Sequence, residues 1–140
     1  ILLVDEDTDA FNSVMDAFRL KRKTDEEKKQ RDAAILSATK NATQIPLLAS
    51  QLCYEVLDLS ITAITKGNPN SVSDAGVAAE AALAGLRGAR LNVLINLDGI
   101  DDGNFCNEMT KKVNSLIKKG ESFHAKVVTA VDQVMKGGNG

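Results

Sequence analysis

Four carboxylates fall within five positions of the stretch "LVDEDTDAFNSVMDAF", which then becomes apolar. On a helix of about 100° per residue, Asp5 and Asp9 share one solvated side. Asp7 falls on the other side, in the apolar stripe of Val4 and Phe11. A carboxyl group that loses water in such a stripe tends to keep its proton and can then act as a general acid. The alternative is a structural acid that bonds a loop amide or a core arginine.

Two asparagine side chains carry a second chemical possibility. The segment "SDAGVAAEAALAGLRGARLNVLINL" predicts a helix with charged residues on one side and a stripe of alanine and glycine on the other. Asn92 and Asn96, one turn apart, lie on the small-residue side. Because an amide offers both a donor and an acceptor, this pair is a candidate for reading a heterocyclic amide or amidine. The alternative is that both hydrogen-bond neighbouring helices or loop backbone.

A polar loop and first helical turn at the start of that segment carry Asn68, Asn70, Ser73 and Asp74. Free backbone N–H groups at the start of a helix suit an anionic or carbonyl-bearing ligand. These four residues are therefore candidates for substrate binding. The alternative is that they serve as turn and cap residues, with Asp74 favoured there by the helix dipole.

Metal and nucleophile chemistry have little support in the sequence. Cys53 and Cys106 have no CxxC spacing, so neither a zinc site nor a disulfide framework is indicated. We interpret both as reduced thiols of a cytoplasmic protein. The sole histidine, His124, has no second His or Cys nearby, and a catalytic triad is not expected. No metal and no permanently bound cofactor is predicted.

The whole chain has the composition of one globular domain, residues 1–140. Its 140 residues are 44% hydrophobic and 26% charged, without an evident run of apolar residues long enough to span a bilayer. The net charge is −2, and the basic run at 19–31 contains no aromatic residue, unlike a stacking platform for bases. Neither nucleic acid nor a membrane is expected as a partner.

Helical periodicity runs through nearly every segment of the chain. Helices are predicted at about 2–18, 24–45, 46–66, 73–97 and 104–135. Thr24 and Glu27 form a capping box at the start of the second helix. Pro46 suits a kink or a fresh helix start, and Gly67 suits a helix end. Five helices with short connections predict an all-α antiparallel bundle, with a loose tail at 137–140.

Four segments resemble one known family in their order and spacing: "LVDEDTDAFNSVMDAFRL", "TDEEKKQRDAAILSATKNATQIPL", "GNPNSVSDAGVAA" and "GARLNVLINL". From Leu2 to about Ala130, the chain resembles the cyclodeaminase family. This family comprises the helical domain of formimidoyltransferase-cyclodeaminase and stand-alone methenyltetrahydrofolate cyclohydrolases. The last predicted helix matches only loosely, and Lys21 stands where relatives usually have proline. The second acid of the family's "VDxD" motif is taken as its catalytic group, and that position is Asp7 here.

The resemblance implies folate one-carbon chemistry. The expected activity is that of a formimidoyltetrahydrofolate cyclodeaminase, which closes 5-formimidoyltetrahydrofolate to 5,10-methenyltetrahydrofolate and releases ammonia, a step of histidine breakdown. The substrate is then a tetrahydrofolate derivative, and Asp7 is the acid that protonates the leaving amine. The asparagine pair and the polar loop would position the pterin and the one-carbon unit. The first alternative is a methenyltetrahydrofolate cyclohydrolase, which adds water to the same methenyl bridge.

Family members also have a further N-terminal portion that helps to build the pocket. The chain begins at Ile1 within an apolar stretch, so we expect that portion to be absent from it. A second alternative is accordingly a non-catalytic module for folate binding or oligomerisation. The resemblance further implies a homodimer and, in some relatives, an attached formimidoyltransferase domain. The basic connector after the first helix is a candidate for steering a polyglutamate tail through Arg19, Lys21, Arg22 and Lys23. The alternative is a solvated charge run.

Overall fold

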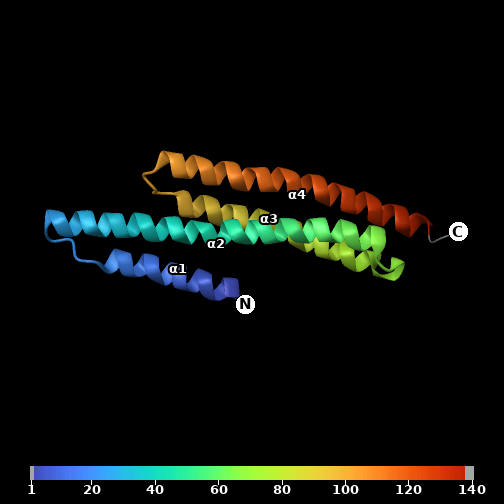
Figure 1. The fold of residues 1–140 in the computed structure, drawn as a ribbon, viewed down its shortest axis with the longest axis horizontal. Helices are drawn as coiled ribbons and strands as arrows, with labels where there is room; N and C mark the ends of the chain where they lie inside the picture. Colours follow the sequence, from blue (N-terminus) through green and yellow to red (C-terminus); the bar gives the residue numbers. More distant parts are fainter. Residues whose placement is uncertain (1, 138–140) are drawn as a thin grey trace.

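The computed structural model describes residues 2–137. They form four α-helices and one 3₁₀-helix: α1 (Leu2–Arg19), α2 (Asp25–Lys66), η1 (Pro69–Ser71), α3 (Val72–Leu97) and α4 (Gly103–Gly137). Successive α-helices run antiparallel, and α2 contacts each of the other three (Figure 1). The predicted all-α antiparallel bundle is confirmed, and the described residues contain no strand. The predicted loose tail lies outside the described residues except for Gly137, which ends α4.

The expectation of five helices is wrong because Pro46 does not end a helix. It lies buried in the interior of α2, which continues unbroken for 42 residues. A proline has no N–H to donate to the carbonyl four residues before it, which here is Ala42. That carbonyl instead accepts the Asn96 side-chain amide of α3 at 3.2 Å. A neighbouring helix thus replaces the bond that would otherwise be missing.

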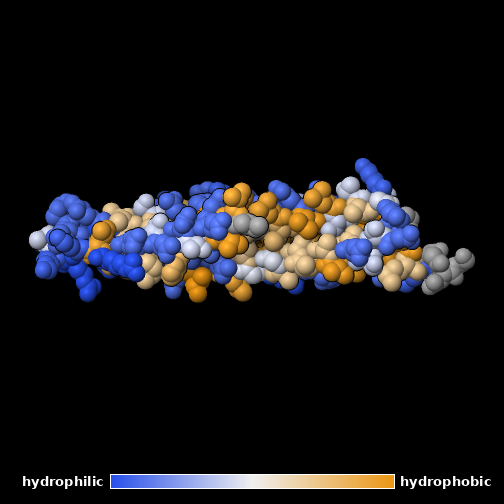
Figure 2. Space-filling view, turned by 90° about the horizontal axis from the view of Figure 1, so that it is seen from below, coloured by the Kyte–Doolittle hydropathy of each residue, from blue (hydrophilic) through white to orange (hydrophobic). Residues whose placement is uncertain are grey.

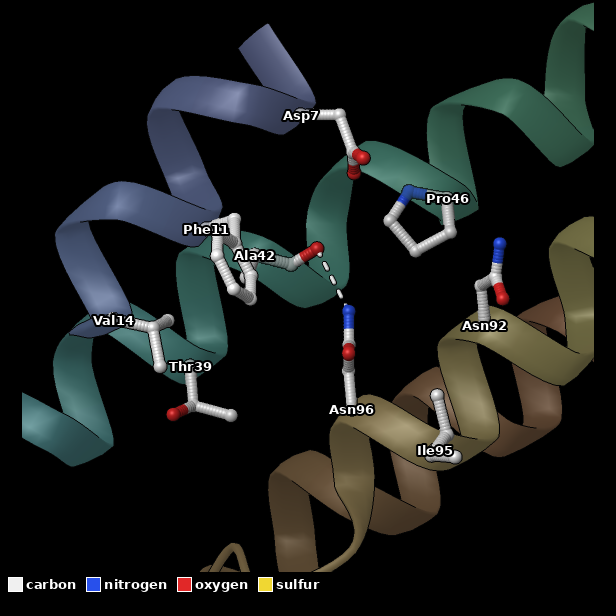
Figure 3. A pocket seen from close by; sticks show the side chains of 9 residues that line it. All are labelled: Asp7, Phe11, Val14, Thr39, Ala42, Pro46, Asn92, Ile95 and Asn96. Atoms are coloured by element: carbon white, nitrogen blue, oxygen red, sulfur yellow. Dashed lines mark hydrogen bonds between the residues drawn. The ribbon is translucent and has the colours of Figure 1, made fainter. Parts of the chain in front are cut away.

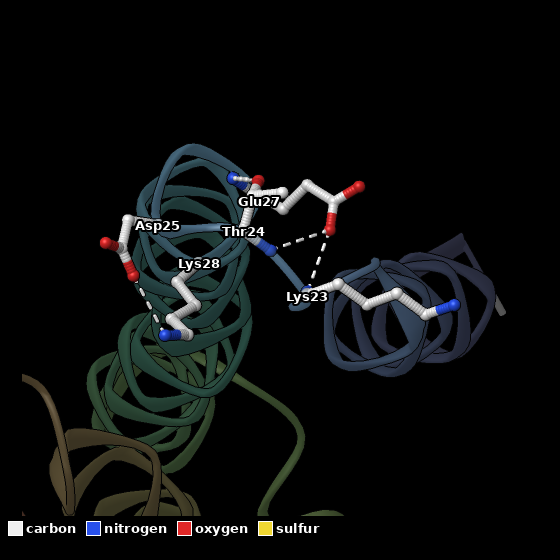
Figure 4. Close-up of polar contacts among 5 residues, drawn as sticks. All are labelled: Lys23, Thr24, Asp25, Glu27 and Lys28. Atoms are coloured by element: carbon white, nitrogen blue, oxygen red, sulfur yellow. Dashed lines mark hydrogen bonds and ion pairs between the residues drawn. The ribbon is translucent and has the colours of Figure 1, made fainter.

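The start of α2 agrees with the sequence prediction. The Thr24 hydroxyl accepts a hydrogen bond from the Glu27 backbone N–H at 3.1 Å, and the Glu27 carboxylate accepts one from Thr24 N–H at 3.2 Å. The same carboxylate accepts the backbone N–H of Lys23 at 2.8 Å (Figure 4). One turn further on, the Arg31 guanidinium donates to the Phe18 carbonyl at 3.3 Å. The capping box and this bond fix how α1 folds back along α2.

Two apolar clusters fill the interior of the bundle. One is centred on Leu57, Leu86 and Val127, and the other on Leu47, Val93, Met109 and Val113. Both clusters draw residues from α2, α3 and α4. At Gly120 the helices approach so closely that an added Cβ would collide with Cδ2 of Leu86. The core therefore belongs to the last three α-helices, and α1 lies against them from outside.

A cluster of polar contacts fixes the beginning of α4. Asp102 caps the helix by accepting the Phe105 backbone N–H at 3.0 Å. Its second carboxylate oxygen accepts the Lys40 ammonium of α2 at 2.5 Å, and the same ammonium lies 5.1 Å from the centre of the Phe105 ring. The Lys40 hydrogen bond, together with the Phe105 N–H, holds the pKa of Asp102 below its usual range. One carboxylate thus both starts α4 and ties it to α2.

Apolar side chains remain at the surface on the side of the bundle that carries α1 (Figure 2). On α1, Val4 is 67% exposed and Phe11 61% exposed, and on α3, Leu91 is 62% and Ile95 71% exposed. A surface of this kind is typical of a protein that covers it with another chain or segment. The homodimer that the sequence predicts would bury part of this surface, and it stays a prediction.

The α2 helix is also long and apolar enough, by length and composition alone, to span a bilayer, contrary to the sequence expectation. Length and composition are weak grounds for a membrane span, because the core helices of soluble proteins share them. In this structure α2 packs against three other α-helices. The cytoplasmic location stays a prediction.

The Lys40–Asp102 pair predicts a specific acid sensitivity. Since the folded-state pKa of Asp102 lies below the unfolded value of 3.8, the pair stabilises the fold fully above that pH. The contribution is lost as the pH falls through the lower, folded-state value. Asp102→Asn keeps a capping oxygen but loses the charge. We therefore expect its urea midpoint to fall less between about pH 5 and pH 2 than that of the unmodified chain.

The control for this experiment is Asp101→Asn, which removes an exposed carboxylate one residue away. Its midpoint should follow that of the unmodified chain at every pH, because surface charges of this kind contribute little. Parallel curves for Asp102→Asn and the unmodified chain would show that the pair does not contribute to stability.

Candidate functional site

A groove of about 370 Å³ opens between α1, α2 and α3. Each helix contributes three lining residues: Asp7, Phe11 and Val14 from α1, Thr39, Ala42 and Pro46 from α2, and Asn92, Ile95 and Asn96 from α3 (Figure 3). Asp7 is the one charged residue in this set. The groove therefore combines one carboxyl group and two amides with apolar walls, which is the usual make-up of a site for a small organic ligand.

The Asp7 carboxyl is directed into the groove, towards Pro46 (Figure 3). It is nevertheless exposed, as are its stripe neighbours Val4 and Phe11. The expectation that the stripe itself desolvates Asp7 is therefore wrong for the described residues. The physical reason is the way α1 packs: Ala17 is its buried residue and Val14 is half-buried, so the helix leans on α2 near its C-terminal end. Its N-terminal half leaves the stripe open.

A second hollow, of about 400 Å³, adjoins the groove and shares Asp7, Pro46 and Asn92 with it. Cys53 and Gly85 line its far part. A Cβ on Gly85 would lie 2.9 Å from the Cys53 sulfur, so the glycine allows α2 and α3 to approach here. Burial raises the pKa of the Cys53 thiol, which makes this cysteine a weaker nucleophile than a free thiol. The two hollows together give an elongated site with Asp7 near its middle.

The two asparagines predicted to act as a pair differ in their surroundings. The Asn96 side chain is half-buried and donates from Nδ2 to the Ala42 carbonyl, as one of the sequence alternatives proposed. Asn92 is exposed, and its amide faces the space beside Pro46 (Figure 3). Both line the same groove as Asp7. The structure thus brings the predicted acid and both predicted amides together.

The polar loop lies elsewhere. Ser73 and Asn92 are separated by about 28 Å of helix at about 1.5 Å per residue, and the loop residues do not line the groove. The Asn68 side chain accepts the Asn70 backbone N–H at 3.0 Å, which is a turn role. Ser73 is not the cap of α3, since the helix already begins at Val72. Asn68, Asn70, Ser73 and Asp74 therefore cannot join Asp7 within one chain in this conformation.

Several groove residues were not singled out from the sequence. Thr39, Ala42 and Ile95 have no type that marks them as functional, and only the packing of three helices brings them to one place. Pro46 carried a usable signal, because a proline inside a helical pattern releases the carbonyl four residues before it. The sequence interpretation used that signal to divide the helix instead.

Residues 2–137 contain no group of three or more His, Cys, Asp and Glu side chains placed to hold a metal ion. His124 lies with Nε2 2.7 Å from a carboxylate oxygen of Glu80, which links α4 to α3. Neither residue lines the groove. The polar side chains that the groove offers are the Asp7 carboxyl group, the Thr39 hydroxyl and the two amides of Asn92 and Asn96.

Comparison with known proteins identifies relatives of the whole bundle. The family model described as formiminotransferase-cyclodeaminase matches residues 1–115. A methenyltetrahydrofolate cyclohydrolase from Methylorubrum extorquens is 42% identical over 129 residues, covering 92% of this chain and 62% of the relative. The formimidoyltransferase-cyclodeaminase of Sus scrofa is 31% identical over 130 residues, covering 93% of this chain and 24% of that protein.

The fold itself has a solved counterpart. The crystal structure of formiminotetrahydrofolate cyclodeaminase from Thermotoga maritima superposes with a TM-score of 0.80 at 24% identity. The match covers 95% of this chain and 62% of that one. This chain thus spans less than two thirds of the length of these relatives. With a family model matched over most of its residues, it belongs to the formiminotransferase-cyclodeaminase family.

Proposed function

We propose that this chain is a folate one-carbon enzyme that acts as a formimidoyltetrahydrofolate cyclodeaminase, with Asp7 as its general acid. The observation that carries the proposal is the placement of Asp7. It is the one charged residue in a groove that also presents two amides and apolar walls. Family membership supports a folate as substrate, and the carboxyl group and two amides in the groove support a proton donor and hydrogen-bonding groups for it.

The reaction balances with one proton donor. The folate N10 attacks the formimidoyl carbon and forms a new C–N bond, and its own proton moves to the imine nitrogen, which becomes an amine. Asp7 then gives a proton to that amine, the bond from carbon to this nitrogen breaks, and ammonia leaves. The lone pair of N5 completes the methenyl bridge, and Asp7 regains a proton from water. Proton donation of this kind accelerates a reaction typically by about 10²- to 10⁴-fold.

The surroundings of Asp7 suit this role once a ligand is bound. A flat ring lying against Phe11, Pro46 and Ile95 would displace water from the carboxyl group. Loss of water favours the protonated, neutral acid over the carboxylate. The desolvation that α1 alone does not provide would then come from the substrate. Asn92 and Asn96 would hydrogen-bond the pterin or the one-carbon unit beside it.

One observation favours a second candidate reaction. The relative at 42% identity is named a methenyltetrahydrofolate cyclohydrolase. In that reaction water adds to the methenyl carbon, and the same carboxyl group would accept or return the proton of the attacking water. The remaining alternative is a non-catalytic module for folate binding or oligomerisation. Turnover should therefore be measured with both candidate substrates.

The first test is Asp7→Asn. The side chain is exposed, so the variant should fold normally while its turnover falls by about 100-fold or more. Ammonia release from formimidoyltetrahydrofolate and the absorbance of methenyltetrahydrofolate measure the two reactions separately. The matched control is Asp9→Asn, an exposed acid that does not line the groove, and it should keep full activity. Near-normal turnover in Asp7→Asn would end the proposed role of this acid.

The basic connector gives a second, independent proposal about the substrate. Lys21, Arg22 and Lys23 are exposed, and α1 extends about 18 Å from Asp7 to Arg19. About five extended residues cover that distance, so a polyglutamate tail could reach the connector from the groove. Positive charge there would attract such a tail, with a strength that falls as salt is added.

Replacing Lys21, Arg22 and Lys23 together by alanine tests this steering. We expect KM to rise about threefold to tenfold for a polyglutamylated folate at low salt, with KM for the monoglutamate unchanged. The difference should vanish near 1 M salt, where the Debye length is about 3 Å. Alanine at Lys118 and Lys119, two exposed lysines of α4, is the matched control. The proposal would be refuted if the unmodified chain had the same KM for the monoglutamate and for the polyglutamylated folate.

A further inference from the structure

Pro46 leaves the Ala42 carbonyl of α2 without its usual donor within the helix, and Ala42 lines the groove. The Ala42 carbonyl would receive the N–H of residue 46 in a regular helix, and proline has none. Ala42, Pro46 and Asn96 all line the groove. The Asn96 amide nitrogen donates to that carbonyl at 3.2 Å (Figure 3). One side chain of α3 thus supplies the hydrogen bond that the proline removes from α2.

This bond determines which end of the Asn96 amide faces the carbonyl. A carbonyl only accepts hydrogen bonds, so the NH₂ group must face Ala42 and the amide oxygen must point away from it. The orientation is therefore fixed by chemistry and does not depend on which of the two similar atoms is assigned. If residue 46 carried an N–H, the carbonyl would be paired within α2. The Asn96 amide would then be free to turn over.

We propose that Pro46 is a positioning residue that acts through Asn96, so that the groove offers the Asn96 oxygen as a hydrogen-bond acceptor to its ligand. The proposal rests on the proposed function, in which the groove binds a tetrahydrofolate. An acceptor at this place favours a one-carbon unit that carries an N–H, as the formimidoyl group does. It disfavours a formyl group, which presents an oxygen where the formimidoyl group has its nitrogen. The Pro46–Asn96 pair is thus a determinant of substrate specificity.

The specificity test compares two folates that differ at one atom, 5-formimidoyltetrahydrofolate and 5-formyltetrahydrofolate. We expect the unmodified chain to bind the formimidoyl compound at least about tenfold more tightly. In Pro46→Ala the amide can turn and donate to the formyl oxygen, so the ratio of the two dissociation constants should fall towards one. Binding of each compound is measured by titration calorimetry. An unchanged ratio in Pro46→Ala would overturn the positioning role.

Denaturation tests the pair without any ligand. Asn96→Ala leaves the Ala42 carbonyl without its donor, so the urea midpoint should drop. In the Pro46→Ala background the helix supplies an N–H to that carbonyl, and the same replacement should change the midpoint little. Asn92→Ala, at the neighbouring amide, should shift the midpoint equally in both backgrounds. Equal shifts for Asn96→Ala in the two backgrounds would overturn the pairing.

The ratio of dissociation constants and the urea midpoints together distinguish a failure of this proposal from a failure of the proposed function. If neither folate binds the unmodified chain, the proposed function is wrong and the specificity role falls with it. The midpoint experiment still decides whether Pro46 and Asn96 act as a pair. If the folates bind and the midpoints show the pairing, but the affinity ratio survives Pro46→Ala, the folate site stands and the specificity role is refuted.

Discussion

The structure depends on α2 remaining one continuous helix through a buried proline. All three other α-helices pack against α2, and none of them could keep its place if the helix broke at Pro46. A proline in a helix interior costs about 3 kcal/mol or more, partly through the hydrogen bond it removes. The Asn96 amide restores a donor to the released carbonyl. The helix therefore continues because a second helix is packed beside it.

Other polar groups inside α2 follow the same logic. Thr43 and Ser50 are fully buried, and their hydroxyls donate to carbonyls one turn back in their own helix, at 2.8 and 3.0 Å. Each buried hydroxyl is thus satisfied without reaching across the bundle. Longer side chains of α2 do reach other helices: Lys40 bonds Asp102 at the start of α4, and Arg31 bonds the Phe18 carbonyl of α1. The buried hydroxyls in the middle of α2 are therefore paired, and this part of the helix forms one wall of the groove.

The groove arises where α1 diverges from the rest of the bundle. Near its C-terminal end α1 is anchored by Ala17 and by the Arg31–Phe18 bond. Towards its N-terminal end Val4 and Phe11 stay exposed, and the carboxyl of Asp7 faces α2 and α3 across a space of molecular size. A carboxyl group held at an open, apolar-walled place changes its solvation when a ligand covers it. The same openness that leaves α1 incompletely packed is what makes Asp7 accessible to a substrate.

The sequence by itself determined the helical class, the capping box at Thr24 and three of the four polar residues of the groove, because these follow from local periodicity and side-chain chemistry. The sequence also predicted correctly which side of α1 carries Asp7, since the angular position of a residue on a helix depends only on the residues of that helix. Tertiary structure decided the rest. Whether Pro46 ends a helix depends on Asn96, fifty positions away. Whether an apolar stripe is buried depends on what packs over it. Both depend on packing between segments that are distant in the sequence, and local sequence does not show such packing. The expected fifth helix and the expected desolvation of Asp7 were therefore wrong for the same physical reason.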